Sequence, residues 1–310
     1  MEAEMREQPA VLAAAAERYY PELVKAVGGR EFELVLLVAR GSSDNAAIYA
    51  RYLVEIHLGI PASLAAPSVL TRYGVRVRYP RALVVGISQS GAATDVAELL
   101  AAQRDAGHTT LAITNTPDSK IAHAAEHTLL LEAGQERSVA ATKTYSASVL
   151  AIHELVRALG GRLESPKGRL PDAAWIETAR ECAQQNLGPI LRSSILFALA
   201  RGYRFGTAHE TALKLMECAL LPCKSYSIAD FQHGPKALAG PGSAAIVFGE
   251  PAEDLQAQGC LTVSAPESPD TPLQPVWDIV FGQWLALLAA RARGLNPDDP
   301  RFIEKVTDTR

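Results

Sequence analysis

Residues 82–91 read Ala-Leu-Val-Val-Gly-Ile-Ser-Gln-Ser-Gly, so a continuous apolar run passes directly into small polar residues. An apolar run of this length, bounded by a turn, is typical of a strand that is buried on both faces of a parallel sheet. The next segment, residues 94–106, has the pattern of a helix. The stretch therefore predicts a strand, a tight turn and a helix, which together form the repeating element of an α/β fold.

The same alternation continues on both sides of this stretch. Further strands are expected at residues 33–39, 63–66, 109–114 and 127–131, and again at 194–200, 224–228, 244–248 and 261–264. Helices are expected among them at residues 5–27, 43–57, 139–159, 172–186, 207–220 and 273–293. Parallel strands need crossover connections that cover both faces of the sheet. The pattern therefore predicts two doubly wound parallel sheets in three α/β/α layers.

A segment rich in Gly, Pro and charge, residues 160–171, separates the two series of strands. It predicts a boundary between a first domain at 1–160, which includes the N-terminal helix, and a second domain at 172–310. The second domain is expected to be shortened, because the stretch between Phe248 and Cys260 leaves little room for a full crossover helix.

An internal repeat supports two related halves. The tripeptide Ala-Arg-Gly at residues 39–41 recurs at 200–202, and Pro61 recurs as Pro222, both 161 residues later. A strand, a turn, a helix and a proline that share one offset indicate a duplication better than they indicate a chance match between two Ala-rich helices.

Composition excludes several classes of function. The chain has 310 residues, 48% hydrophobic and 21% charged, which is typical of a soluble globular protein. Its 30 basic and 34 acidic residues leave a formal charge of −4, so nothing favours nucleic acid as a partner. No apolar run could cross a bilayer and no secretory leader is recognisable, so a cytoplasmic protein without membrane contact is expected. Four cysteines without a Cys-x-x-Cys pair, and histidines without ligand spacing, predict neither a metal nor a cofactor.

Two serine-rich turns follow predicted strands. Ser88, Gln89 and Ser90 follow one strand, and Gly41, Ser42 and Ser43 follow another. Small residues let the backbone approach an anion, and the helix that follows each turn offers unpaired N–H groups. These residues could simply cap the helices. Because ligands of doubly wound sheets bind at the carboxyl ends of the strands, a site for a phosphate or a polar sugar is the favoured interpretation.

Three charged residues, Glu210, Lys214 and Glu217, share one face of the predicted helix at 207–220. Such spacing is commonly a solvated stripe. The surrounding sequence is apolar, however, so the charges could instead line a cleft, where a carboxylate moves a proton and an ammonium stabilises an enediolate. His233 lies in a Gly-Pro turn, where it could be a structural residue or an acid–base group that opens a sugar ring. Lys305 by itself is an ordinary surface lysine.

Six segments, taken together and in order, resemble the sugar isomerase (SIS) family. They are MREQP at 5–9, ARGSSD at 39–44, ISQSG at 87–91, EAGQERSVAATKTY at 132–145, the run from ETALKLMEC to FQHGP at 210–235, and GLNPDDPRFIEKVT at 294–307. The chain is most similar to proteins with two tandem SIS domains, namely the type II glucosamine-6-phosphate deaminases and the isomerase half of glucosamine-6-phosphate synthase. The resemblance covers nearly the whole chain and implies two flavodoxin-like domains.

The resemblance also implies roles for individual residues. It implies that the serine-rich turns hold the sugar phosphate, with a backbone contribution from Val139. Glu217 resembles the base that moves a proton between C1 and C2, and Lys214 resembles its electrostatic helper. His233 resembles the ring-opening group that reaches the site from a neighbouring subunit, and Lys305 resembles a tail lysine that closes over the sugar.

Two positions depart from the family pattern. Ala93 stands where the family often has Ser or Thr, and the adjacent Thr94 is a candidate to supply the missing hydroxyl. Arg40 stands where the synthase commonly has Cys, which is closer to the type II deaminases.

The reaction that the resemblance implies is glucosamine 6-phosphate plus water giving fructose 6-phosphate plus ammonia, catalysed by a homodimer with a shared site. Glutamine-dependent synthesis is not expected of this polypeptide, because no cysteine precedes Cys182 to serve a glutaminase domain. Three alternatives stay open. They are an aminotransferase-like isomerase without a glutaminase domain, an enzyme for a related substrate such as galactosamine 6-phosphate or a fructosamine 6-phosphate, and a non-catalytic sugar-phosphate sensor.

Overall fold

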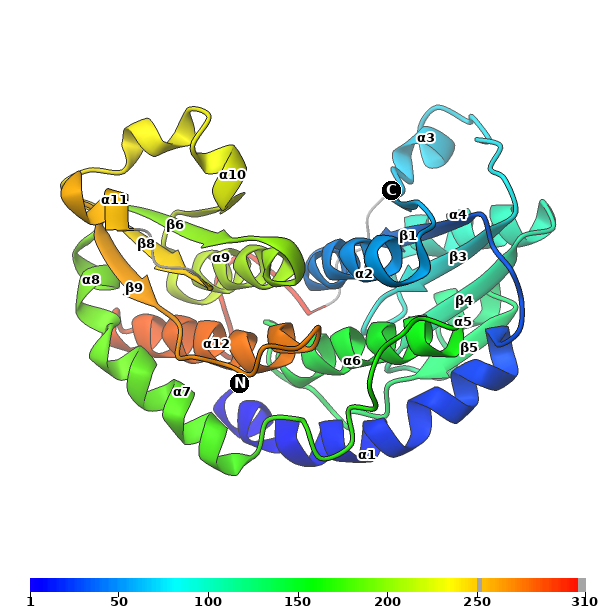
Figure 1. Cartoon of the computed structure of the whole chain (residues 1–310), viewed down its shortest axis with the longest axis horizontal. Helices are drawn as coiled ribbons and strands as arrows, with labels where there is room; N and C mark the ends of the chain where they lie inside the picture. The colour runs from blue at the N-terminus through cyan, green and yellow to red at the C-terminus, as the bar shows by residue number, and fades with distance from the viewer. Residues whose placement is uncertain (250–252, 306–310) are drawn as a thin grey trace. The chain divides into compact units, whose positions relative to one another are not determined.

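The computed structural model describes residues 1–249 and 253–305, which form two compact units (Figure 1). The five-stranded unit consists of Ala10–Glu136 and Lys143–Arg169. The four-stranded unit consists of Met1–Pro9, Arg137–Thr142 and Leu170–Lys305. The long first helix, α1 (Glu2–Val27), begins in the four-stranded unit and continues in the five-stranded one.

All strands of the five-stranded unit are parallel, in the order β2-β1-β3-β4-β5. This is the flavodoxin-like order, which reverses direction between β1 and β3. The strands are β1 (Leu34–Ala39), β2 (Ala62–Leu64), β3 (Ala82–Ile87), β4 (Thr109–Thr114) and β5 (His127–Leu130). The helices after α1 are α2 (Ser42–Leu58), α3 (Ser68–Thr71), α4 (Thr94–Asp105), α5 (Lys120–Ala124) and α6 (Lys143–Ala158).

Both faces of this sheet are covered. Alternate residues of β1, such as Leu36 and Val38, pack with Leu100 of α4 and Ile121 of α5 in one apolar cluster. The helices α2 and α6 pack together, and α2 lies against β1 and β2 (Figure 1). Every residue of β1 and β3 is consequently buried, which is why these strands are apolar throughout and not only at alternate positions.

The four-stranded unit repeats this plan with strands in the order β7-β6-β8-β9, again all parallel. Its strands are β6 (Ile195–Ala200), β7 (Cys223–Ser227), β8 (Ser243–Val247) and β9 (Leu261–Ser264). One face packs against helices that include α7 (Ala173–Gln185), α8 (Leu187–Arg192), α9 (Phe205–Ala219) and α12 (Gln274–Ala292). The other face packs against the short helices α10 (Ile228–Phe231) and α11 (Glu253–Ala257), with the 3-10 turn η2 (Pro235–Leu238) beside them. A second 3-10 turn, η1 (Gly202–Arg204), leads into α9.

The internal repeat extends further than the sequence match that first indicated it. Adding 161 to both bounds of β1 gives both bounds of β6, and the first residues of β2 and β3 become the first residues of β7 and β8. The pairing register repeats as well, because Val35 pairs with Ala62 as Leu196 pairs with Cys223. The two units therefore use one strand plan through their first three strands.

The predicted fold class, α/β with two doubly wound parallel sheets in three layers, is confirmed. The domain limits 1–160 and 172–310 stay a prediction. The helix predicted to begin at residue 139 is wrong by four residues, since α6 begins at Lys143. The carbonyls of Ser138 and Thr142 accept hydrogen bonds from Lys305 and Gln283, and these contacts hold the preceding segment outside the helix. Within the described residues no helix is long and apolar enough to cross a membrane.

Candidate functional site

Two serine hydroxyls organise the backbone of the turn after β3. The Ser88 Oγ accepts the N–H of Gly91 at 3.1 Å, and the Ser90 Oγ accepts the N–H of Ala92 at 3.3 Å. Each hydroxyl therefore keeps its own proton to donate to a ligand. Gly91 has φ of +64°, and a Cβ there would lie 2.1 Å from the Ser119 Oγ, so only glycine fits.

The turn after β1 lies directly beside it. Ala39 and Ile87, the last residues of β1 and β3, are partners in the ladder, so Ser42 and Ser43 begin α2 one strand away from the Ser88 turn. Gly41, at the start of this turn, has φ of +57°. The residues at the N-caps of α2 and α4, Gly41 and Ala93, make no side-chain cap hydrogen bond. The structure thus brings the two predicted serine turns together at the switch point of the sheet.

An ion pair joins these two turns. The guanidinium of Arg40, from the turn after β1, contacts the carboxylate of Asp95, in the first turn of α4, at 2.6 and 2.9 Å. Asp95 is buried, whereas nearly half of the Arg40 side chain is exposed. Arg40 therefore spans the gap between the two turns and leaves part of its guanidinium accessible beside them.

A second cation, Lys120, was not predicted from the sequence. Its Nζ donates to the Thr94 Oγ1 at 2.8 Å, at the first residue of α4. Lys120 is exposed, and no carboxylate of the described residues pairs with it. Its ammonium thus stands at the start of the helix that follows the Ser88 turn, beside the position where Ala93 lacks a hydroxyl. The only signal in the sequence is a lysine at the start of α5, after the neighbouring strand.

The charged face of α9 is buried, so the solvated-stripe interpretation is wrong. Lys214 and Glu210 have 1% and 0% of their side chains exposed, and 23% of Glu217 reaches solvent. The Lys214 Nζ lies 2.6 Å from the Glu217 Oε2 and 3.3 Å from the Glu210 Oε1. One ammonium is therefore held between two carboxylates, one fully buried and one at the surface.

The two carboxylates keep Lys214 protonated. Burial alone would lower the pKa of this lysine, but the charges of Glu210 and Glu217 outweigh burial and raise its pKa above the ordinary value. An ammonium in this state cannot act as a nucleophile that forms a Schiff base, because it has no free electron pair. Lys214 is thus suited to stabilising negative charge.

A loop of the four-stranded unit, Arg137–Thr142, contains Val139 and is in contact with Lys305 through the neighbouring Ser138. The Lys305 Nζ donates to the Ser138 carbonyl at 2.6 Å. The N–H of Ser138 donates to the Glu4 carboxylate at 3.2 Å, so α1 holds the same loop from its other side. The backbone of Ser138, the residue before Val139, is consequently held by two side chains that are remote in sequence.

His233 is not brought to the charged face of α9 within one chain. It is exposed and follows α10, whose Phe231 packs on Phe197 and Leu199. The helix α9 packs on the opposite face of that sheet, against the alternate residues Leu196 and Ala198. The sheet therefore stands between His233 and the carboxylates of its own chain.

The predicted site residues thus fall into two groups. The five-stranded unit contains Thr94 and all the candidate phosphate-binding residues of the two serine turns. The remaining candidates, which are Glu217, Lys214, His233, Lys305 and Val139, belong to the four-stranded unit. Among the residues that the structure describes, no cluster of His, Cys, Asp and Glu could hold a metal ion.

Comparison with known proteins gives consistent matches. The model of the SIS domain matches residues 33–158. The isomerizing glutamine–fructose-6-phosphate aminotransferase of Methanothermobacter thermautotrophicus is 30% identical, over an alignment that covers 89% of this chain and 51% of that protein. The chain spans about half the length of the curated relatives it matches.

Two solved structures match over nearly the full length of both chains. The glucosamine-6-phosphate deaminase of Thermotoga maritima has a TM-score of 0.84 and 23% identity, with 99% of each chain covered, which shows a common fold. A candidate phosphosugar isomerase from Silicibacter pomeroyi DSS-3 has a TM-score of 0.82 and 30% identity, covering 96% of this chain and 98% of the other. The chain therefore belongs to the SIS domain family.

Proposed function

We propose that the chain is an amino-sugar phosphate deaminase of the SIS family, which converts glucosamine 6-phosphate and water into fructose 6-phosphate and ammonia in the cytoplasm. The observation that carries this proposal is the buried ammonium of Lys214 between two carboxylates, one of which, Glu217, reaches the surface. A solvated charge stripe would not need this burial, and a Schiff-base enzyme would need a neutral lysine.

The chemistry that this arrangement supports is an aldose–ketose proton transfer. In the open-chain substrate, Glu217 removes the proton from C2 and negative charge develops on the oxygen at C1, which Lys214 stabilises. As this proton returns to C1, one proton of the amino group passes to the oxygen at C1, so a hydroxyl forms at C1 and an imine at C2. Water adds to the imine carbon, the C–N bond breaks and ammonia leaves, so the hydrolytic half needs no nucleophilic side chain.

The direct test is a panel of sugar phosphates assayed for ammonia release. Glucosamine 6-phosphate is expected to release ammonia together with an equal amount of fructose 6-phosphate, and galactosamine 6-phosphate and a fructosamine 6-phosphate serve as competing substrates. A panel with no ammonia release from any member would contradict the proposal.

The second candidate is isomerisation of a sugar phosphate without loss of ammonia. It is supported by the relatives named as isomerizing aminotransferases and by the likeness to a candidate phosphosugar isomerase. The same panel separates the two candidates, because an isomerase would exchange solvent hydrogen at C1 or C2 without releasing ammonia. A sugar-phosphate sensor would bind the ligand and do neither.

Substrate binding is expected to depend on the phosphate group. Each hydrogen bond to a charged group contributes about 1.5–3 kcal/mol, so several lost together weaken binding by roughly 100-fold or more. Calorimetry with glucosamine 6-phosphate and with glucosamine measures the difference. Equal affinities would exclude the serine turns after β1 and β3 as a phosphate site.

Lys120 is expected to take part in this phosphate site. Lys120→Met should weaken binding of glucosamine 6-phosphate by roughly 10- to 100-fold, and Lys120→Arg should restore part of it, because one charge-assisted contact is lost or kept. Binding should also become less sensitive to salt. The matched control is Lys167→Met, which removes an exposed lysine of the same unit that pairs with Glu17. If both variants bind like the parent, Lys120 has no role in the site.

A homodimer with a shared site is also proposed, since His233 is exposed and separated by a sheet from the α9 carboxylates of its own chain. His233→Ala and Glu217→Gln should each be inactive alone. After the two are mixed, unfolded and refolded together, half the dimers carry both variants and one of their two sites is intact. Activity should then return to about a quarter of the parent value. A mixture that stays inactive, or a fully active monomer in sedimentation, would rule the shared site out.

A further inference from the structure

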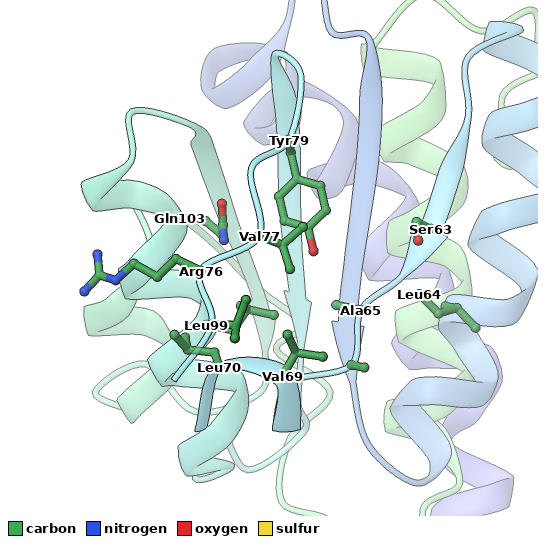
Figure 2. A pocket seen from close by; sticks show the side chains of 12 residues that line it. Ser63, Leu64, Ala65, Val69, Leu70, Arg76, Val77, Tyr79, Leu99 and Gln103 are labelled. Carbon is green, nitrogen blue, oxygen red and sulfur yellow. The ribbon is translucent and has the colours of Figure 1, made fainter. Parts of the chain in front are cut away.

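The connection from β2 to β3 in the five-stranded unit contains almost no helix. The helix α3 has four residues, and the chain then runs without regular structure through residues 72–81 to reach β3. A crossover between parallel strands usually carries a helix that covers the sheet. Here a strap, residues 72–80, takes its place and leaves a pocket of about 140 Å³ beneath it (Figure 2).

The pocket is mostly apolar. Figure 2 shows Val77 and Tyr79 of the strap at the top, Leu99 of α4 and Leu70 at the lower left, and Val69 and Ala65 to the right of them. Its volume is close to that of an apolar cavity of about 150 Å³ that takes up benzene. The pocket is therefore large enough for one six-membered ring.

The internal repeat shows which groups occupy this space in the other unit. At an offset of 161, Leu36, Ala65 and Leu70 correspond to Phe197, Tyr226 and Phe231. In the four-stranded unit these three rings pack on one another, with centroids 5.0 to 6.4 Å apart. The first residues of β1, β2 and β3 have the same spacing as the first residues of β6, β7 and β8, so the offset of 161 holds on either side of the pocket. The pocket thus lies where the equivalent unit places a cluster of aromatic side chains.

One polar group of the lining has no partner. Gln103, on α4, is 3% exposed and its Oε1 is buried without a hydrogen bond. Within the described part of the chain, the side chain of Gln103 makes no hydrogen bond at all. Because a buried amide without a partner is costly, a ligand that donates a hydrogen bond to it would be favoured.

The charged groups near the pocket do not favour an anionic ligand. Arg76 contributes to the rim, but its guanidinium points away from the pocket, as Figure 2 shows. The remaining labelled side chains of the lining are apolar or uncharged. An uncharged occupant fits these walls better than a charged one, which would lose its hydration without gaining a counter-charge.

We propose that this pocket binds a small uncharged aromatic molecule, whose ring takes the place of the missing aromatic cluster and whose O–H or N–H donates to Gln103. The site lies within the five-stranded unit and is separate from the serine turns. The proposal does not depend on the deaminase activity.

The test uses the full chain with phenol and toluene as probes, which share a ring and differ in the hydrogen-bond donor. Phenol is expected to raise the melting temperature and to bind in calorimetry. Leu70→Phe introduces the residue found at the equivalent position 231, and should fill the pocket and abolish phenol binding. Leu191→Phe, a change at an exposed leucine of α8, is the matched control and should bind like the parent.

Gln103→Leu isolates the hydrogen bond. The preference for phenol over toluene should fall by roughly 2- to 12-fold in this variant, which is the effect of one neutral hydrogen bond. If Leu70→Phe does not fold, Ala65→Tyr, which introduces the residue found at the equivalent position 226, fills the same pocket. The proposal is overturned if phenol does not bind the parent chain, if a filled variant binds it equally well, or if Gln103→Leu leaves the preference unchanged.

Discussion

Replacing Glu217 with glutamine is expected to lower ammonia release from glucosamine 6-phosphate by about 10²–10⁴-fold, which is the usual contribution of a general base. Glutamine has nearly the same shape, but it has neither the charge nor the basic electron pair that removes a proton from carbon. Binding of the substrate should survive, because the proposed phosphate contacts come from the serine turns after β1 and β3 and glutamine keeps the shape of the side chain. Steady-state rates and calorimetric affinities measured on the same preparation separate the two effects.

The matched control is Glu181→Gln, on the exposed surface of α7, which should leave the rate unchanged. Solvent hydrogen exchange at C2 gives a second reading, because it reports proton removal before any C–N bond breaks. A Glu217→Gln enzyme that releases ammonia at near-parent rate would show that α9 does not carry the base, whatever reaction the protein catalyses.

Replacing Lys214 with methionine is expected to destabilise the fold by about 3–5 kcal/mol, because it removes one partner of a buried ion pair. Glu210 is fully buried beside this lysine and cannot turn to solvent. Adding Glu210→Gln to the variant should recover much of the loss, since the remaining carboxylate, Glu217, reaches water. Urea denaturation of the parent, the single variant and the double variant measures the effect.

Lys236→Met is the control for this pair. Lys236 pairs with Asp254 at a site where both side chains are partly exposed, so its loss should cost no more than about 1 kcal/mol. Equal losses for Lys214→Met and Lys236→Met would contradict a strongly coupled buried pair.

The dependence of fold stability on pH follows from the raised pKa of Lys214. A group whose pKa is higher in the folded state contributes its full stabilisation at any pH below its pKa in the unfolded chain, which is about 10.4 for lysine. This contribution is lost only as the pH rises through the pKa of the group in the folded state. The parent should therefore keep this contribution throughout the neutral and mildly alkaline range. The loss of stability in Lys214→Met should be smaller in acid, where the carboxylate of Glu210 becomes protonated.

Much of the fold could be predicted because its signals are local. The apolar runs at β1 and β3 are buried along their whole length, so composition alone identified them as strands. The serine turns could be placed together because parallel strands end on the same edge of a sheet. The repeat could be recognised from a few residues, since strand register is preserved at one offset.

The remainder depends on contacts between distant residues. Nothing in the spacing of Glu210, Lys214 and Glu217 distinguishes a solvated stripe from a buried one, because only the packing of α9 against α12 and the sheet decides it. The Lys120–Thr94 contact joins residues 26 apart on two different helices. The segment before Lys143 has the apolar composition of a helix, yet bonds to Lys305 and Gln283 keep it out of one.

The discontinuous make-up of the four-stranded unit bears on how the chain folds during synthesis. Glu4 and Gln8 leave the ribosome early, but the residues that they bind, Ser138 and Gln283, follow 134 and 275 positions later. At the usual 5–20 residues per second, Gln8 waits about 15–55 seconds for its partner. All the described parts of the five-stranded unit have been synthesised by residue 169. Vectorial synthesis should therefore complete that unit first, and Met1 and Met5 at the start of the chain stay without their final apolar packing until α12 has been made.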